Sequence, residues 1–229
     1  MAWGAVDNFH SRLQDIVSAY TGSAGGITGT DSAAVQQFIL DGCYDVLEKI
    51  KVIDTGSVFE FCISTSFDNN NGQDFDENRD IIAVERNGYP ARVVNFQIRH
   101  RLTDSDSIHY ATEKYPVFYV GPDTSGNGRK LYMLPAATGS ELGYVYYIPD
   151  YTLTSWNSST SSINNFPRKF YDHVTLYAAI RLLERNYIEL VNEEEDLELA
   201  QGIAAGIQIL KQRYAEMFTK PDLGVKEWN

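Results

Sequence analysis

Two stretches near the start of the chain carry apolar residues at the three- and four-residue spacing of an amphipathic helix. In the first, residues 7–20, this spacing puts the apolar side chains on one helical face. Four glycines in residues 21–30 then interrupt the pattern and predict a flexible loop. A second helix is predicted to run to about Lys51, with a residue between Thr30 and Ser32 as its N-cap. The two segments together predict a helical hairpin.

The apolar period then falls from about 3.6 to 2, which is the period of a half-buried β-strand. Residues 58–65 predict a first strand, and residues 81–85 predict a second. The dipeptide Asn87-Gly88 is the favoured two-residue hairpin turn, from which residues 89–94 are expected to return. Residues 95–114 give only a weak signal, between strand and loop.

A further strand is predicted at residues 115–120, and residues 129–149 are expected to form a hairpin around a small turn. Both faces of this hairpin are apolar, whereas a sheet in water normally has one polar face. The second face is therefore covered by another sheet, by the chain's own helices or by a neighbouring subunit. Tyrosine is common on surfaces that become buried on association. The candidate protein-contact residues on these strands are Tyr132, Tyr144, Tyr146 and Tyr147. The alternative is that these side chains fill an internal sandwich core.

The last part of the chain returns to helical spacing. Residues 166–191 predict a third helix, with Pro167 in its first turn. In the fourth helix, Gly202 and Gly206 lie four residues apart, so another helix could approach closely there. Pro221 ends that helix and leaves a short tail.

The tail contains three apolar residues that are costly to expose on a free segment. They are candidate anchors into a partner, and the alternative is that the tail folds back on its own helices or is disordered. These residues are Leu223, Val225 and Trp228.

The order of elements predicts an α+β fold. Each helical end presents one apolar stripe that needs a cover, so residues 1–52 and 164–229 are expected to form a four-helix bundle with a C-terminal tail. Residues 53–155 are expected to form an inserted antiparallel β domain, sandwich or barrel-like, between the second and third helices. The polar residues 156–163 read as a linker.

Charge and composition restrict the class of function. The chain of 229 residues has a formal net charge of −12, which argues against a dedicated nucleic-acid binder but would let DNA slide past without being held. No signal peptide and no run long enough to cross a bilayer is evident, so synthesis in a cytoplasm is expected. Cys43 and Cys62 fit small core residues better than a disulfide.

Motifs for catalysis or for metal binding are not evident. The histidines lack metal-ligand spacing, and His10 and His173 are predicted to lie on the polar faces of helices or at interfaces. Residues 121–130 begin like a phosphate loop but lack the lysine and the following helix. Residues 68–78 partly match a calcium loop, with the glycine one position early, so a weak cation site stays open. No cofactor, metal site or catalytic residue is predicted, although sequence cannot exclude a pair of carboxylates brought together by the fold.

Four runs of residues occur in a recognisable order: YPVFYVG (115–121), KLYMLPA (130–136), GYVYYIP (143–149) and FPRKFYDHVTLYAAIRLLERNY (166–187). The first three resemble the β core of the head-to-tail adaptor proteins of tailed bacteriophages, also called gatekeepers or tail tubular A proteins. The fourth resembles the helix that follows in those chains. These are patterns of apolar and aromatic residues, so no catalytic residue carries over.

The resemblance implies a structural virion protein and not an enzyme. Such adaptors form a ring, usually a dodecamer, that binds the portal protein, continues the DNA channel and offers a docking face to the tail nozzle or tube. It implies that the tyrosines and Gly202 and Gly206 lie at subunit or nozzle interfaces, and that the apolar tail binds the portal. The expected location is the neck of the virion, after synthesis in the bacterial host, with no membrane contact. The alternatives are another tail or neck structural protein, such as a tail-completion or nozzle protein, and a tail-associated glycan hydrolase.

Overall fold

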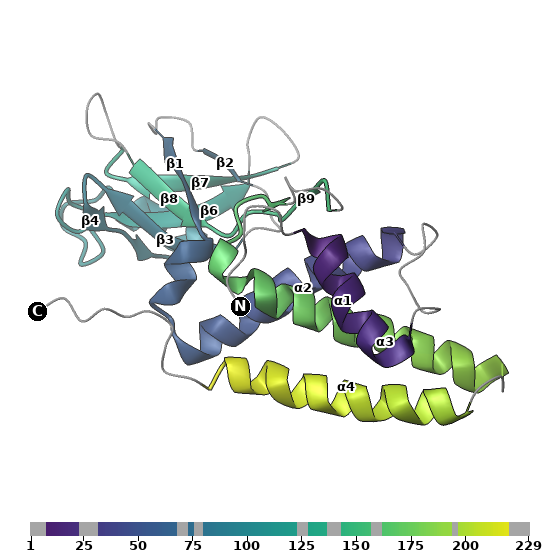
Figure 1. Cartoon of the computed structure of the whole chain (residues 1–229). Coiled ribbons are helices and arrows are strands. Elements are labelled where there is room, and N and C mark those ends of the chain that lie inside the picture. Colours follow the sequence, from purple (N-terminus) through teal and green to yellow (C-terminus); the bar gives the residue numbers. More distant parts are fainter. Residues whose placement is uncertain are drawn as a thin grey trace, which may run out of the picture. The chain divides into compact units, whose positions relative to one another are not determined.

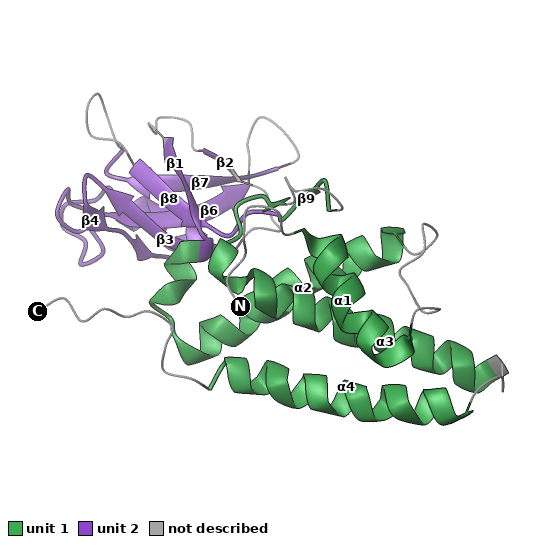
Figure 2. Cartoon of the chain, in the orientation of Figure 1, with its two compact units in different colours: residues 1–60, 151–229 green, residues 61–150 purple. Residues whose placement is uncertain are grey.

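A computed structural model describes most of the chain, in eight stretches (Figure 1). It divides into two compact units, one made of residues 1–60 and 151–229 and the other of residues 61–150 (Figure 2). The first unit is mainly helical and the second is built from strands, so the predicted α+β class is confirmed at that level. The described stretches are 8–22, 32–67, 73–75, 80–122, 128–136, 143–156, 162–193 and 197–219.

The helical unit contains four α-helices among its described residues. Helix α3 contacts each of the other three, and α4 also contacts α1. Each helix buries most of the apolar stripe that its spacing predicts; Leu13 and Val17 of α1, for example, are fully buried, whereas Ile188 of α3 is exposed. The helices are α1 (Phe9–Thr21), α2 (Ser32–Ile53), α3 (Tyr171–Glu193) and α4 (Leu197–Met217). None of them, over the residues described, has both the length and the apolar character needed to span a bilayer.

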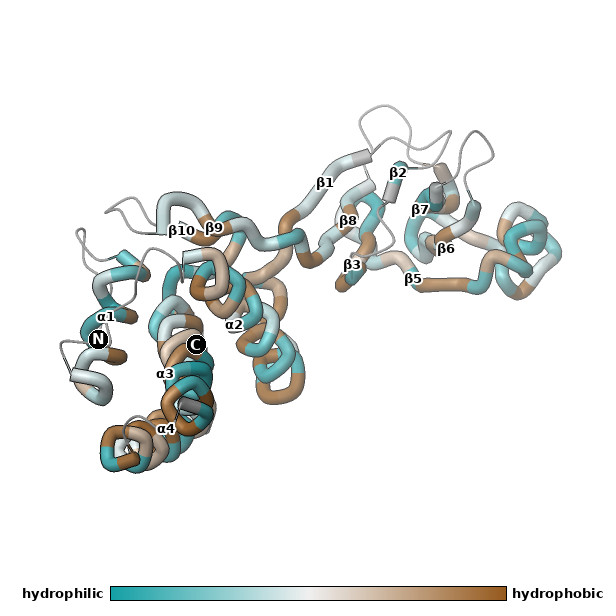
Figure 3. Tube along the Cα trace, turned by 90° about the vertical axis from the view of Figure 1, so that its right-hand side faces the viewer, coloured by the Kyte–Doolittle hydropathy of each residue, from teal (hydrophilic) through white to brown (hydrophobic). Residues whose placement is uncertain are grey.

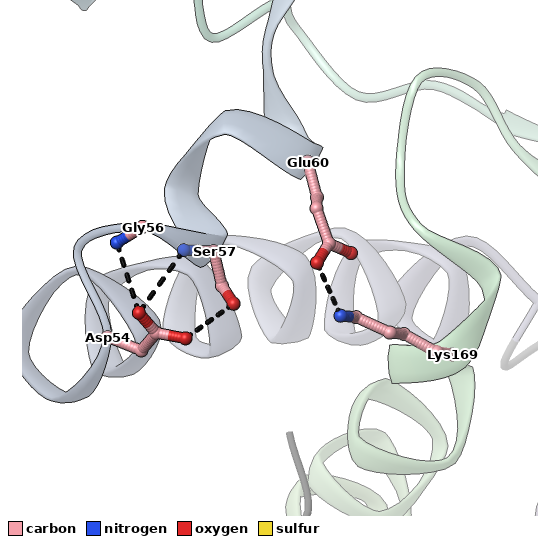
Figure 4. Close-up of polar contacts among 5 residues, drawn as sticks. All are labelled: Asp54, Gly56, Ser57, Glu60 and Lys169. Carbon is pink, nitrogen blue, oxygen red and sulfur yellow. Dashed lines mark hydrogen bonds and ion pairs between the residues drawn. The ribbon is translucent and has the colours of Figure 1, made fainter. Parts of the chain in front are cut away.

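A short 3₁₀ helix, η2 (Ser57–Phe61), follows α2 where the sequence predicts the start of a strand. The Asp54 carboxylate causes this difference, because it accepts hydrogen bonds from the backbone N–H groups of Gly56 and Ser57 at 3.0 and 3.3 Å (Figure 4). It also accepts from the Ser57 hydroxyl at 2.6 Å, and this bond is the main reason why the pKa of Asp54 is lowered. The first strand therefore begins only at Ile63.

The segments that flank the β unit belong with the helices. Lys169, in the 3₁₀ helix η4 (Arg168–Phe170), pairs with Glu60 at 2.6 Å (Figure 4). Strand β9 (Leu153–Thr154) pairs with β10 (Ser162–Ile163), and the Tyr171 hydroxyl accepts a hydrogen bond from the backbone of Ile163. The units consequently divide after residues 60 and 150, and the end of the predicted linker forms a strand of the helical unit.

Two four-stranded sheets make up the described part of the β unit. The first has the order β1–β8–β3–β4, with β1 (Ile63–Phe67), β8 (Gly143–Tyr147), β3 (Ile81–Arg86) and β4 (Tyr89–Pro90). The second has the order β2–β7–β6–β5, with β2 (Gln73–Phe75), β7 (Arg129–Leu134), β6 (Val117–Pro122) and β5 (Arg92–Val93). Strands β5 and β6 run parallel, so the prediction of a purely antiparallel domain is wrong at this edge.

The predicted hairpin of residues 129–149 does not form. Strands β7 and β8 lie in different sheets, and the side chains of Leu131 and Met133 meet those of Val145 and Tyr147 in one core between them. The connection that follows β7 is held by the buried Arg86, which donates hydrogen bonds to the backbone carbonyls of residues 135 and 136. One of the two apolar faces is therefore covered by the opposite sheet of the same chain.

The predicted turn at Asn87-Gly88 is confirmed. Both residues have positive φ, 48° and 79°, and Arg86 pairs with Tyr89 across the turn. The returning strand is shorter than expected, because the chain leaves the first sheet after Pro90 and joins the second sheet at β5.

Candidate interaction surfaces

The tyrosines predicted to contact other protein differ in how far their own unit covers them. Tyr132 is half-buried and stacks on Tyr119, with ring centroids 5.1 Å apart. Phe96 packs on the same Tyr119 ring, and burial raises the pKa of Tyr119. The outer face of β7 is thus partly covered by neighbours within the second sheet.

Tyr144 and Tyr146 lie half-buried on the outer face of the first sheet. The Tyr146 hydroxyl donates a hydrogen bond to the Glu85 carboxylate at 3.0 Å, and this bond raises the pKa of Tyr146. Tyr147, by contrast, is only 7% exposed and belongs to the core between the sheets. It has no free face for a partner, so its predicted role as an interface residue is replaced by a role in packing.

The two glycines of α4 also have different surroundings. A Cβ at Gly206 would lie 2.3 to 2.9 Å from ring atoms of Tyr20, so the close approach predicted there is made by α1 of the same chain. A Cβ at Gly202 would meet nothing within 4 Å, and this glycine is exposed. Only Gly202 is therefore left open for a neighbouring subunit.

Several predicted features lie outside the described residues. These include Leu223, Val225 and Trp228 of the tail, most of the acidic loop at residues 68–78, and the centre of the glycine-containing loop at residues 121–130.

The most exposed apolar side chains of the β unit lie within or next to residues 95–114, where the sequence gives its weakest signal. Ile108 is 93% exposed, Tyr115 is 77% exposed and Val93 is 68% exposed. Tyr89 and Tyr110 are also exposed. Ile108 and Tyr110 were missed because residues 95–114 have neither a period of 2 nor a period of 3.6, whereas Tyr89, Val93 and Tyr115 lie in segments that were predicted as strands.

This segment is built on a small core of its own, and we call residues 92–115 the platform. It contains the 3₁₀ helix η3 (Phe96–Arg101), which Asn95 caps by accepting a hydrogen bond from the backbone of Gln97 at 2.9 Å. The buried side chains of Leu102 and Ala111 pack with Val117 of β6 beneath it. The exposed side chains are therefore held on a defined backbone.

The platform carries four exposed cations and three exposed acids (Asp104, Asp106 and Glu113), whereas the chain as a whole is strongly acidic. Between residues 86 and 103 the sequence has four arginines and no acidic residue. Arg92, Arg99, Arg101 and Lys114 are exposed, and none forms an ion pair with a described carboxylate. The guanidinium of Arg99 lies 4.1 Å from the centre of the Phe96 ring. Figure 3 shows hydrophilic and hydrophobic residues alternating along the chain that follows β5.

Several cations of the helical unit, in contrast, have partners. Arg12 of α1 pairs with Asp172 of α3 at 2.6 Å. Lys49 of α2 pairs with Asp45, which also accepts a hydrogen bond from the Tyr214 hydroxyl of α4. These contacts join helices to one another and account for the half-buried charges without any ligand.

His173 of α3 was predicted to lie on a polar face or at an interface, and in the structure it is half-buried against aromatic rings of the helical unit. Its ring packs edge-on against Phe170 and Phe218, with centroids 5.4 and 5.0 Å apart. Burial lowers the pKa of His173, and the backbone of Met217 and the charge of Asp172 oppose that shift. Neither ring nitrogen has a well-formed hydrogen bond to a described residue. His10 instead packs against Trp156.

No protein-family model matches the sequence, and neither does any curated protein. Across the described stretches, no group of three or more His, Cys, Asp or Glu side chains is arranged to hold a metal ion. Function is therefore inferred from the exposure, charge and packing of the surface residues described above.

Proposed function

We propose that the chain is a structural protein of a tailed-bacteriophage virion, a head-to-tail adaptor that forms a ring between the portal and the tail nozzle or tube. In this proposal the four helices act as one bundle and the β sandwich is an insertion between α2 and α3. The ring, a dodecamer in the adaptors that the chain resembles, continues the DNA channel. No catalytic step and no cofactor is involved.

The observation that carries the proposal is the exposure of apolar side chains on an ordered backbone. Ile108, Tyr115 and Val93 are exposed although the segment that holds them has its own core and internal hydrogen bonds. Apolar side chains held in this way mark surfaces that other proteins cover. An adaptor needs at least three such surfaces, toward its two ring neighbours and toward the portal or tail.

The charge of the chain also supports the proposal. A formal net charge of −12 repels phosphates, so a channel lined by such subunits would let DNA pass without holding it. A protein that bound DNA tightly would hinder packaging and release, because phosphate contacts add up along the duplex.

The test is to locate the chain in particles produced by the genome that encodes it. We expect mass spectrometry of purified virions to find the chain, and cryo-electron microscopy with a C-terminal tag to place it in a ring below the portal. Its absence from virions, or label at the fibre tips, would overturn the proposal. Polysaccharide cleavage by the purified chain would favour a hydrolase instead.

A further inference from the structure

We propose that the platform at residues 92–115 is one half of the contact between copies of this chain, and that it docks on an acidic surface of the next copy. The inference deepens the proposed function and rests on it, because a ring supplies the second copy. It assigns a surface and a partner chemistry that the resemblance does not carry.

The exposed side chains of the platform have the composition of a protein-protein contact. Arginine and tyrosine are the residues most enriched in such contacts and in their energetic centres. The platform presents Arg92, Arg99 and Arg101 together with Tyr110 and Tyr115. The highly exposed Val93 and Ile108 add apolar area.

The backbone of the platform is fixed before any partner binds. The N–H groups of Arg92 and Val94 donate to the carbonyls of Pro116 and Phe118, each at 2.9 Å. The N–H of Ala111 donates to the carbonyl of Leu102, also at 2.9 Å, and closes the segment on itself. A preorganised surface loses little conformational entropy on docking, which favours its use as a contact.

Charge indicates what the partner is. The platform holds four basic and three acidic residues, so the rest of the chain has 28 of the 31 acidic residues but only 15 of the 19 basic residues. Any second copy therefore offers mainly acidic surface to the unpaired cations of the platform. Complementary charge of this kind fixes which faces meet and raises the rate of association.

The same charge favours one symmetry of the contact. Two platforms facing each other across a two-fold axis would set a nearly balanced surface of four cations and three acids against itself, and would gain less attraction than a platform set against the acidic remainder of the chain. When a platform docks on the acidic surface of the next copy, that copy's own platform can dock on a third copy. Repetition of such a head-to-tail contact closes into a ring when the rotation allows it.

Nucleic acid is a weaker candidate for the partner. The chain as a whole repels phosphate, and the four cations of the platform lie among three acids, Asp104, Asp106 and Glu113. An acidic protein surface satisfies the arginines and also covers Val93, Ile108 and Tyr115.

The experiment compares two substitutions of identical chemistry in the full chain. Arg101→Glu changes the platform, whereas Arg213→Glu changes an exposed arginine of α4 that likewise has no ion pair with a described residue. Self-association is measured by sedimentation velocity at about 20 mM salt, up to about 100 μM protein, where screening of surface charge is weak. We expect wild type to associate, Arg101→Glu to weaken association about tenfold or more, and Arg213→Glu to match wild type within about twofold.

A third variant, Ile108→Ser, tests the apolar part of the contact and is expected to weaken association without lowering thermal stability, because the side chain is exposed. A wild-type chain that stays monomeric under these conditions overturns the inference. Equal association of Arg101→Glu and Arg213→Glu does so too. Binding of a short DNA duplex by wild type that Arg101→Glu abolishes would reassign the platform to nucleic acid.

The outcomes separate the two proposals. If the chain forms a ring below the portal and Arg101→Glu still assembles normally, the contact surface is wrong and the adaptor function stands. If association depends on Arg101 but the chain is absent from virions, the contact stands and the adaptor function is wrong.

Discussion

Substitution of the two glycines of α4 by alanine tests the packing of the helical unit with a matched pair. Alanine in place of an exposed helical glycine stabilises a protein by about 1 kcal/mol, because glycine loses more backbone entropy on folding. Gly202→Ala should show this gain in full, since the new methyl group meets nothing within 4 Å. For a chain of this size, that gain corresponds to a rise in melting temperature of about 2–4 °C.

Gly206→Ala gains the same stabilisation from the higher helix propensity of alanine, but it places its methyl group against Tyr20. The nearest ring atoms lie at 2.3, 2.6 and 2.9 Å, well inside van der Waals contact, so Tyr20 or α1 must move. Overpacking of this kind costs about 1–3 kcal/mol, which cancels or exceeds the gain. We therefore expect Gly206→Ala to be less stable than Gly202→Ala by about 1–3 kcal/mol.

Urea unfolding followed by circular dichroism measures both variants, and a double-mutant cycle with Tyr20→Ala isolates the contact. Removing the ring should restore the stabilising effect of alanine at residue 206. If Gly206→Ala stabilises the chain as much as Gly202→Ala while Tyr20 is intact, the close approach of α1 to α4 is wrong. Gly202→Ala also tests assembly, because an added methyl group would hinder any neighbour that packs closely there.

Three further predictions concern protonation, thiol reactivity and the tail. Burial lowers the pKa of His173 in the folded state, so the unfolded chain binds the extra proton more readily. The free energy of unfolding should therefore fall as the pH drops below about 6.5. Urea titrations at different pH values should show a flatter dependence for His173→Gln. Burial raises the pKa of the Cys43 thiol and so lowers its reactivity. In a Cys62→Ser variant, where Cys43 is the remaining thiol, alkylation by iodoacetamide should be slow until the chain unfolds. Rapid labelling of the native variant would contradict the burial of Cys43. Deletion of residues 221–229 should leave a folded protein that no longer joins portal-bearing heads, and normal assembly of the truncated chain would show that the tail is not the portal anchor.

Helices were predictable from this sequence because their signal is local. The three- and four-residue spacing around Leu13 and Val17 requires only one apolar face to be buried, whichever element covers it. The hairpin turn at Asn87-Gly88 was predictable for a similar reason, since two adjacent residues determine its backbone.

Strand pairing was not predictable in the same way. The sequence of residues 129–149 has the pattern of two strands joined by a short connection, and a hairpin has the same pattern. Whether the two strands pair within one sheet or face each other from two sheets depends on distant strands, because β1 and β3 occupy both edges of β8. His173 was misplaced because a histidine has polar atoms but can also pack as a flat ring between Phe170 and Phe218.

The platform could not be predicted from the sequence because its core is small and irregular. Leu102 and Ala111 are separated by turns and meet only when the segment closes on β6. The one usable signal was compositional, namely Arg92, Arg99 and Arg101 in a stretch, residues 86–103, that has no acidic residue in a chain of net charge −12.

The pairing of β1 with β8 has a consequence for how such a chain can be altered. Ile63, just after the chain enters the β unit, is the direct partner of Tyr147, just before it leaves. Paired residues on neighbouring antiparallel strands have Cα atoms only about 5 Å apart. The whole sandwich could thus be exchanged for a tight loop, or transplanted into a surface turn of an unrelated host protein, without rerouting the polypeptide on either side.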